Sequence, residues 1–347
     1  MRSENKKHLI RIGAITIFAV TIYMLTAVLG FKSPHGINQL EGLYKQPKGT
    51  IDVVFMGTSH IHCGVNTGLL WEKYGMASYD YSGAEQPLWM TYHYLKELYK
   101  YQSPEVVVID LFAPARIKED YQYTWMNENI HGMRFSLNKL QMMFASMEPH
   151  MISKYFPSFA SYHSRYDDLE KGDFNDFFWN DHEQIAFKGY TPYFKKEPQD
   201  KPEIETTEQG GLTEKSEKYL RKIIKYTKEQ GSELAFIVVP YIMTESDKET
   251  YNEICRIARE EDVFFVDYNE CYKEIGLDFA NDFNDNSHLN YWGSCKFTSF
   301  LGENLRANFH ISNKAGWEGY ESWDENTKLI LEELEIWKEE TFSNLLF

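Results

Sequence analysis

The stretch VVFMGTSHIHCGV, Val53 to Val65, joins an apolar run to a turn that contains Gly57, Ser59 and two histidines. A continuous apolar run is typical of a strand that is buried on both faces of a parallel sheet. Polar residues at the carboxyl end of such a strand lie where open α/β sheets bind their ligands. Three interpretations fit this turn: a nucleophilic serine, a metal site that uses His60 and His62, or an ordinary polar turn.

Apolar runs and helical patterns alternate over much of the remaining chain. Strands that are continuously apolar and separated by helices predict a parallel sheet covered on both faces. With the opening strand over 50–57 there are five such runs, so we expect an α/β fold with a flavodoxin-like parallel sheet. A capping box of Ser246 and Glu249 is expected at the start of one helix. The other expected strands are 77–82, 105–112, 234–241 and 263–268, and the expected helices are 68–75, 87–101, 213–230, 246–261, 291–308 and 322–342.

Two segments do not follow this alternation. Residues 32–49 are interrupted by proline and glycine and are expected to be a tether. Residues 113–210 combine short helical patterns with polar, proline-containing pieces and are expected to be a helical insertion. The predicted main domain therefore spans 50–347 and contains this insertion.

The N-terminus contains an uncharged run of 20 residues, Ile12 to Phe31. As a helix this run would be about 30 Å long, which matches the hydrocarbon core of a bilayer. A cleaved signal peptide is the alternative, but the sequence after the run has no clear small-x-small cleavage site. We expect an uncleaved single-pass anchor in the cell membrane, with residues 1–11 cytoplasmic and the C-terminal domain extracytoplasmic. The basic residues that favour this orientation are Arg2, Lys6, Lys7 and Arg11.

Charge and cysteine content exclude some classes of protein. With 36 basic and 52 acidic residues the formal net charge is −16, which argues against nucleic acid as a partner. The four cysteines show no C-x-x-C spacing, so no zinc motif is predicted, and their pairing is left open.

A second polar segment, FNDNSHLNYWG, places Asp285 three residues before His288, after the fifth predicted strand. A serine hydroxyl is a weak nucleophile unless an imidazole takes its proton, and a carboxylate must orient that imidazole. The D-x-x-H spacing supplies both groups from one loop. Ser59 would reach them from the end of the first strand, which completes a Ser-His-Asp triad.

These two blocks resemble the SGNH/GDSL hydrolase superfamily. The anchor, the GTSH sequence in place of GDSL and the DNSHLN box resemble its membrane-anchored DltD-like or AlgJ-like branch. The resemblance covers residues 50–112 and 213–308. It implies the SGNH hydrolase fold and a role in acyl modification of cell-envelope polymers, with a membrane-bound O-acyltransferase as a candidate partner.

The resemblance also implies roles for single residues. Ser59 would be the nucleophile, His288 the general base and Asp285 its orienting carboxylate. Gly83, in YDYSGAEQP, and the backbone N–H of Ser59 would form the oxyanion hole. The asparagine of the family's third block is missing from DLFAPAR, so one donor is absent or comes from elsewhere, for example from Gln86. Losing one such donor typically costs about 10²–10³ in rate.

Other polar residues have weaker assignments. His60 and His62 could hold a metal, but no second compact set of ligands follows, so no metal is predicted. His60, His163 and Arg165 are candidate substrate contacts. The alternative for Arg165, in YHSRYDD, is an ion pair with Asp167 or Asp168.

We therefore expect a membrane-anchored extracytoplasmic serine esterase or acyltransferase. Its substrates would be acyl esters of a cell-surface polysaccharide or a teichoic-acid-like polymer, and it would need no cofactor. The alternative is a non-catalytic envelope-assembly or polymer-binding protein on the same scaffold.

Overall fold

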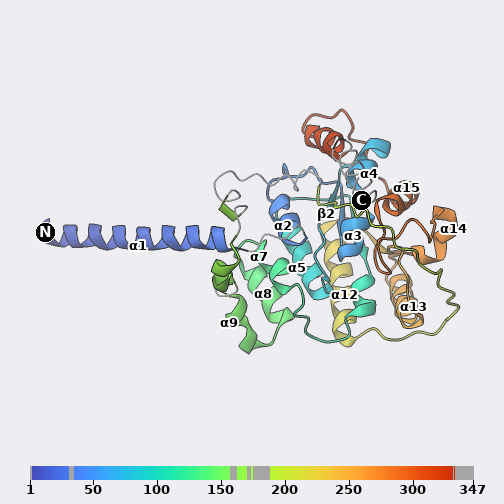
Figure 1. Cartoon of the computed structure of the whole chain (residues 1–347), viewed down its shortest axis with the longest axis horizontal. Coiled ribbons are helices and arrows are strands. Elements are labelled where there is room, and N and C mark those ends of the chain that lie inside the picture. Colours follow the sequence, from blue (N-terminus) through green and yellow to red (C-terminus); the bar gives the residue numbers. More distant parts are fainter. Residues whose placement is uncertain are drawn as a thin grey trace, which may run out of the picture. The chain divides into compact units, whose positions relative to one another are not determined.

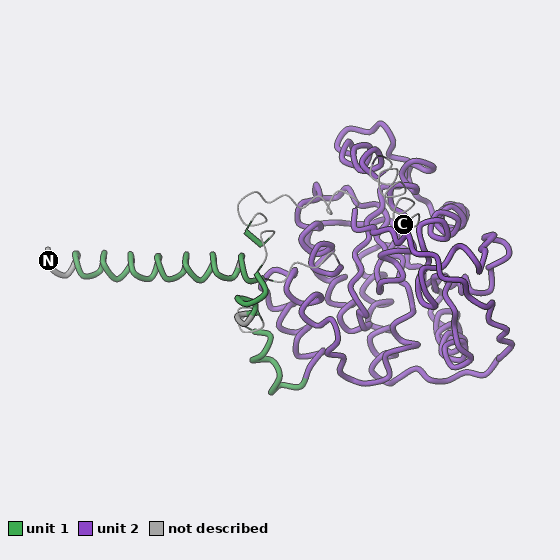
Figure 2. The backbone as a smooth tube through the Cα atoms, in the orientation of Figure 1, with its two compact units in different colours: residues 1–32, 148–183 green, residues 33–147, 184–347 purple. Residues whose placement is uncertain are grey.

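The computed structural model of the chain describes residues 2–30, 35–156, 162–169, 173–174, 188–330 and 332. By the contacts within the chain it divides into two compact units (Figure 2). Unit 1 comprises residues 1–32 and 148–183, and unit 2 comprises residues 33–147 and 184–347. The insertion expected over 113–210 is therefore shared between the two units.

The centre of unit 2 is a five-stranded parallel sheet with helices around it (Figure 1). The strand order β2-β1-β3-β4-β5 is the flavodoxin-like order, so the predicted α/β fold and sheet are confirmed. The register pairs Val54 with both Tyr79 and Val107. The strands are β1 (Val53–Met56), β2 (Ser78–Asp80), β3 (Val106–Asp110), β4 (Glu233–Val238) and β5 (Phe264–Asp267).

Alternate strand residues face opposite sides of the sheet, and both sides are buried. On one side, Phe55 and Val108 belong to a core cluster that also contains Leu70, Phe297 and Leu301. Those three residues come from helices α4 (Thr67–Tyr74) and α15 (Tyr291–Asn308). The packing explains why the strands are continuously apolar.

The remaining helices of the sheet region lie close to the predicted ranges. They are α3 (Ser59–Gly64), α5 (Leu88–Leu98), α12 (Glu214–Gln230) and α13 (Glu245–Glu260). Residues 321–330 are helical, and the rest of the helix expected over 322–342 lies outside the described residues, apart from residue 332. Shorter helical elements are α6 (Phe112–Arg116), α7 (Met126–His131), α8 (Leu137–Ser146), η4 (Tyr268–Cys271) and α14 (Tyr272–Ile275).

The capping box expected at the start of α13 is wrong in position. Thr244, not Ser246, is the N-cap: its hydroxyl accepts a hydrogen bond from the backbone N–H of Asp247. The Asp247 carboxylate accepts in return from the N–H of Thr244 at 2.7 Å. Aspartate serves here at the position where the sequence pattern expects glutamate or glutamine.

The expected tether over 32–49 contains a helix, α2 (Ile37–Leu43), that belongs to unit 2. Leu40 and Leu43 are fully buried, and the side chain of Gln39 donates a hydrogen bond to the carbonyl of Gly189 at 3.0 Å. Residues 35–49 are part of the folded unit and are not a linker, and residues 32–34 lie outside the described residues. The proline and glycine residues of the expected tether lie before, within and after the seven-residue helix α2, so the composition did not indicate a helix.

Unit 1 begins with the long helix α1 (Arg2–Leu29). Its window Lys6–Thr26 has 21 residues and a mean hydropathy of 1.9, so the helix is long and apolar enough to cross a membrane. The other described elements of unit 1 are η1 (Pro149–Met151), α9 (Ile152–Tyr155) and η2 (His163–Asp167).

Candidate active site

Ser59 lies at the carboxyl end of β1, as the first residue of α3. The preceding Gly57 has a φ of +143°, and a Cβ atom there would lie 2.9 Å from the Cβ of Asp110. Only glycine fits both the conformation and the space. Thr58 is the N-cap of α3, and its hydroxyl accepts from the N–H of His60. The tight turn therefore fixes Ser59 at the end of the sheet where the carboxyl ends of the strands lie.

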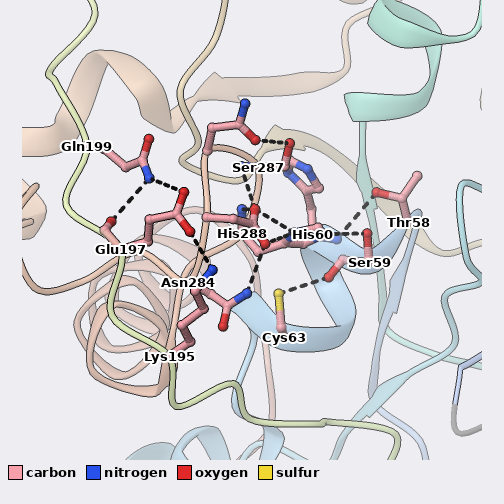
Figure 3. Close-up of polar contacts among 12 residues, drawn as sticks. Thr58, Ser59, His60, Cys63, Lys195, Glu197, Gln199, Asn284, Ser287 and His288 are labelled. Atoms are coloured by element: carbon pink, nitrogen blue, oxygen red, sulfur yellow. Dashed lines mark hydrogen bonds and ion pairs between the residues drawn. The ribbon is translucent and has the colours of Figure 1, made fainter.

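Ser59, His288 and Asp285 form a continuous chain of hydrogen bonds. Figure 3 shows Ser59 and His288 beside one another. The Oγ of Ser59 lies 2.8 Å from Nε2 of His288. On the other side of the ring, Nδ1 of His288 lies 2.9 Å from Oδ1 and 3.1 Å from Oδ2 of Asp285. The structure thus brings together the three residues that the sequence singled out, over a separation of 229 positions.

The surroundings of Asp285 favour its ionised form. Burial acts to raise the pKa of Asp285, but the hydrogen bond and charge of His288 and the amide of Ser287 outweigh it and hold this pKa well below its usual range. An ionised carboxylate only accepts hydrogen bonds. Nδ1 of His288 is therefore the protonated nitrogen of the neutral ring, which leaves Nε2 free to accept the Ser59 proton.

Asn290 holds the loop that carries Asp285 and His288. Its side-chain oxygen caps α15 by accepting from the N–H groups of Trp292 and Gly293. Its side-chain nitrogen donates to the carbonyl of Asn281 at 2.8 Å, across the base of the loop. An isolated bridge between Phe283 and Leu289 closes the same loop. The asparagine two residues after His288 therefore has a positioning role that was not predicted from the sequence.

Asp110 lies buried beneath the turn that carries Ser59. Its Oδ1 accepts from the backbone N–H of Val239 at 3.1 Å, and its Oδ2 accepts from the N–H of Phe112 at 3.3 Å. Burial raises the pKa of Asp110 to about 7, although these amides and the Thr58 hydroxyl act to lower it. Asp110 was not predicted as a site residue, and its only signal in the sequence is a carboxylate at the end of an apolar strand.

Two of the expected oxyanion donors have other partners. The N–H of Gly83 donates to the carbonyl of Gly57 at 3.1 Å and continues the pairing of β2 with β1. Gln86 is fully buried, and its side chain contacts Thr91 and Asn129. The expected roles of Gly83 and Gln86 therefore need correction. The N–H of Ser59 has no hydrogen-bond acceptor within the described part of the chain.

His60 and His62 point into different surroundings. His60 is buried against Phe112 and lies 5.4 Å from His288 between ring centroids, and burial lowers its pKa well below the usual value. His62 contacts Gln39 at 2.8 Å and Asp80 at 3.4 Å, and its ring stacks on His35. Among the described residues, no group of three or more His, Cys, Asp or Glu side chains could hold a metal ion.

The position of His60 bears on its expected contact with substrate. Neither ring nitrogen of His60 has a hydrogen-bond partner among the described residues, and both are buried. The imidazole of His60 is therefore neutral and packs against Phe112 in the interior, next to His288. Cys63, on the next turn of α3, is also buried, and its thiol donates to the carbonyl of Ser59 (Figure 3).

Arg165 and His163 belong to unit 1, in η2. Arg165 pairs with Asp173 at 3.0 Å, so the expected ion pair with Asp167 or Asp168 is wrong in its partner. The side chain of His163 lies outside the described residues. The expected contact of both residues with substrate stays a prediction.

One rim of the site comes from the segment 191–199, which lies within the insertion expected from the sequence. The ring of Tyr193 lies edge-on to His288, with centroids 5.9 Å apart. The carbonyl of Tyr193 accepts from the N–H of Tyr291 at 2.7 Å, and the N–H of Glu197 donates to the carbonyl of Phe283 at 3.0 Å. Backbone pairing therefore fixes this segment beside the Asp285–His288 loop.

No protein-family model matches the sequence, and no curated protein sequence matches it. Several solved structures are similar in fold. A proposed acylhydrolase from Bacteroides fragilis has 11% identity and a TM-score of 0.39, with 77% of this chain and 94% of that chain covered. A gut microbial diltiazem-metabolizing enzyme has 12% identity and a TM-score of 0.39, with 75% and 48% covered. A proposed GDSL-like lipase from Parabacteroides merdae has 14% identity and a TM-score of 0.34, with 74% and 96% covered. At these identities and TM-scores the likeness carries no functional conclusion.

Proposed function

We propose that this chain is a serine esterase or acyltransferase of the SGNH type. The observation that carries the proposal is the hydrogen-bonded chain from Ser59 through His288 to Asp285, at 2.8 Å and 2.9 Å. Both distances lie within the range for a nucleophile and its general base. Ser59 is the nucleophile, His288 the general base and Asp285 the carboxylate that orients the imidazole.

The reaction follows from these positions. Oγ of Ser59 attacks the carbonyl carbon of an acyl ester while Nε2 of His288 takes the hydroxyl proton. The N–H of Ser59 stabilises the oxyanion of the tetrahedral intermediate. The intermediate collapses to an acyl-enzyme, and His288 gives its proton to the departing alcohol oxygen. Water or a sugar hydroxyl then attacks the acyl-enzyme with His288 again as the base, which releases an acid or a new ester.

The same proposal places the enzyme at the outer face of the cell membrane. Helix α1 serves as the anchor, with its basic N-terminal residues in the cytoplasm and unit 2 outside. The acyl acceptor is a cell-surface polysaccharide or a teichoic-acid-like polymer, and a membrane-bound O-acyltransferase is the candidate partner. These assignments come from the resemblance of the GTSH and DNSHLN blocks to the DltD-like or AlgJ-like branch of the SGNH/GDSL superfamily. An N-terminal anchor agrees with them.

Ester hydrolysis by the purified full-length protein in detergent tests the catalytic part. The wild type is expected to hydrolyse a small activated ester such as p-nitrophenyl acetate, and Ser59→Ala is expected to lose this activity. Ser246→Ala is the matched control because Ser246 is exposed on α13. Equal activity of wild type and Ser59→Ala would contradict the assignment of the nucleophile.

A second candidate function is a non-catalytic scaffold that binds envelope polymer. The hydrogen bond from Gly83 to Gly57 favours it, because that bond removes an expected oxyanion donor. Complementation of a strain that lacks the gene separates the two functions. Full rescue by Ser59→Ala would favour the scaffold, and failure of a stably produced Ser59→Ala protein would favour catalysis.

A further inference from the structure

The C-terminal end of α1 is held by a side chain from the second segment of unit 1. Nη1 of Arg165 donates to the carbonyl of Leu29 at 2.8 Å and also contacts the carbonyl of Gly30. Carbonyls at the end of a helix have no partner within the helix. Nη2 of Arg165 donates to Asp173 at 3.0 Å. The guanidinium is thus fixed between the helix end and a buried carboxylate.

The exposure of α1 changes sharply at this point. Ile17 is 70% exposed and Leu25 43%, but Leu29 is only 6% exposed. The apolar window of the helix ends at Thr26, and Leu29 lies three residues further, about 4.5 Å along the axis. With α1 as a membrane anchor, the contact between Arg165 and Leu29 therefore lies where the helix leaves the hydrocarbon core.

Two exposed aromatic side chains adjoin this contact. Tyr166 directly follows Arg165 and is 65% exposed, and Phe174 directly follows Asp173 and is 45% exposed. Consecutive Cα atoms are about 3.8 Å apart, so the Cα atom of each aromatic residue lies about 3.8 Å from that of a residue in the Arg165–Asp173 ion pair. Tyr and Trp are enriched at the membrane–water interface, where the ring leaves water without entering the hydrocarbon core. Phe is common on the apolar face of segments that lie in this interface.

We infer that Tyr166 and Phe174 insert into the headgroup region of the leaflet that α1 leaves, so that η2 lies on the membrane surface. This inference rests on the proposed role of α1 as an anchor. Asp167 and Asp168 are exposed in the same turn and would not be attracted to anionic lipids. The contact therefore depends on the two rings, and added salt is not expected to weaken it.

Site-directed spin labelling of the full-length protein in lipid nanodiscs tests the depth of the rings. The three partly exposed cysteines are replaced by serine, and the buried Cys63 is kept. A single cysteine for the label is introduced by Tyr166→Cys or Phe174→Cys. Ile17→Cys reports the centre of α1, and Phe135→Cys reports a residue of unit 2 that is 67% exposed. The replaced cysteines are Cys255, Cys271 and Cys295.

Collision rates with oxygen and with a water-soluble nickel chelate give the depth of each label. We expect the labels at 166 and 174 to show chelate collisions several-fold below those at 135 and above those at 17, at low and at high salt. If the label at 17 lies in the bilayer but the labels at 166 and 174 collide with the chelate as often as the label at 135, the inference is wrong and the role of α1 as an anchor is retained. If the label at 17 also matches 135, the anchor and the inference are both wrong.

Discussion

The carboxylate of Asp110 accepts a hydrogen bond from the backbone N–H of Val239 at 3.1 Å and ties the end of β3 to the end of β4. Its other oxygen accepts from Phe112 and lies 3.5 Å from the hydroxyl of Thr58, the residue before Ser59. One buried side chain therefore joins three neighbouring strand ends at the edge of the sheet. The position of Ser59 depends on this junction.

Removing this junction is expected to destabilise the fold. Asp110→Ala leaves the buried N–H of Val239 and the partly buried N–H of Phe112 without an acceptor, and a buried donor without a partner costs about 1–3 kcal/mol. Chemical denaturation should show a free energy of unfolding about 2–5 kcal/mol lower than that of the wild type. Asp200→Ala, at an exposed aspartate, should change it by less than about 0.5 kcal/mol. An unchanged midpoint for Asp110→Ala would show that the amides find other partners.

Asp110 also predicts a pH dependence of stability. Burial raises its pKa to about 7 in the folded chain, so the folded state keeps a proton that the unfolded state loses near pH 4. The contribution of Asp110 to the free energy of unfolding is therefore complete below pH 4 and is lost as the pH rises to about 7. Denaturation at several pH values should show that the free energy of unfolding falls less steeply over this range for Asp110→Asn than for the wild type. The same slope in both proteins would contradict the assignment.

Gly57→Ala tests the space beneath the turn that carries Ser59. The new Cβ would lie 2.9 Å from the Cβ of Asp110, at a φ of +143°. We expect loss of ester hydrolysis and destabilisation by about 1–3 kcal/mol or more, since both the conformation and the contact are strained. Gly210→Ala is the control, because a Cβ there meets nothing within 4 Å. Full activity of Gly57→Ala would mean that the turn can relax without moving Ser59.

Asp285→Asn tests the orientation of the imidazole. An amide in place of the carboxylate can donate to Nδ1 of His288 and favours the tautomer that cannot accept the Ser59 proton. The rate of ester hydrolysis should fall by about 10³–10⁴-fold, with little change in the melting temperature. Asp262→Asn is the matched control, because Asp262 is exposed and asparagine tolerates its φ of 52°. A fall of less than tenfold for Asp285→Asn would argue against its role.

The cap of α13 can be tested with a matched pair. The hydroxyl of Thr244 accepts from the N–H of Asp247, so Thr244→Ala should lower the free energy of unfolding by about 0.5–2 kcal/mol. Ser246→Ala lies inside the first turn and should have almost no effect. Thermal or chemical denaturation distinguishes the two variants. Equal effects would mean that the cap is not where the structure places it.

The sequence predicted the sheet and the proximity of Ser59, His288 and Asp285 because both depend on local patterns. Continuous apolar runs such as Val106 to Ile109 leave few alternatives to a buried parallel strand. Residues at the carboxyl ends of such strands must meet at one edge, which brings Ser59 towards His288. Short sequence patterns were sufficient to predict the contact between Ser59 and His288 because the order of the strands brings the two distant segments together.

The rest of the site depends on contacts that no local pattern encodes. The burial of Leu40 in α2 and the placement of Tyr193 beside His288 arise from tertiary packing of segments that are irregular in sequence. The N–H of Gly83 donates to the carbonyl of Gly57 and continues the pairing of β2 with β1. The residues around Gly83 do not indicate whether this N–H pairs with the neighbouring strand or faces the site. The role of Asp110 is also hidden, because a carboxylate that ends a strand has the same sequence signature whether it is exposed or buried.

The most direct measurement is to map the covalent adduct of a fluorophosphonate on the full-length protein by mass spectrometry of its peptides. The Ser59–His288 contact predicts a single modified peptide, with the phosphonyl group on Oγ of Ser59, and strongly reduced modification in His288→Ala. An adduct on another serine, or no adduct on protein that is shown to be folded, would contradict the assignment of Ser59 as an activated nucleophile.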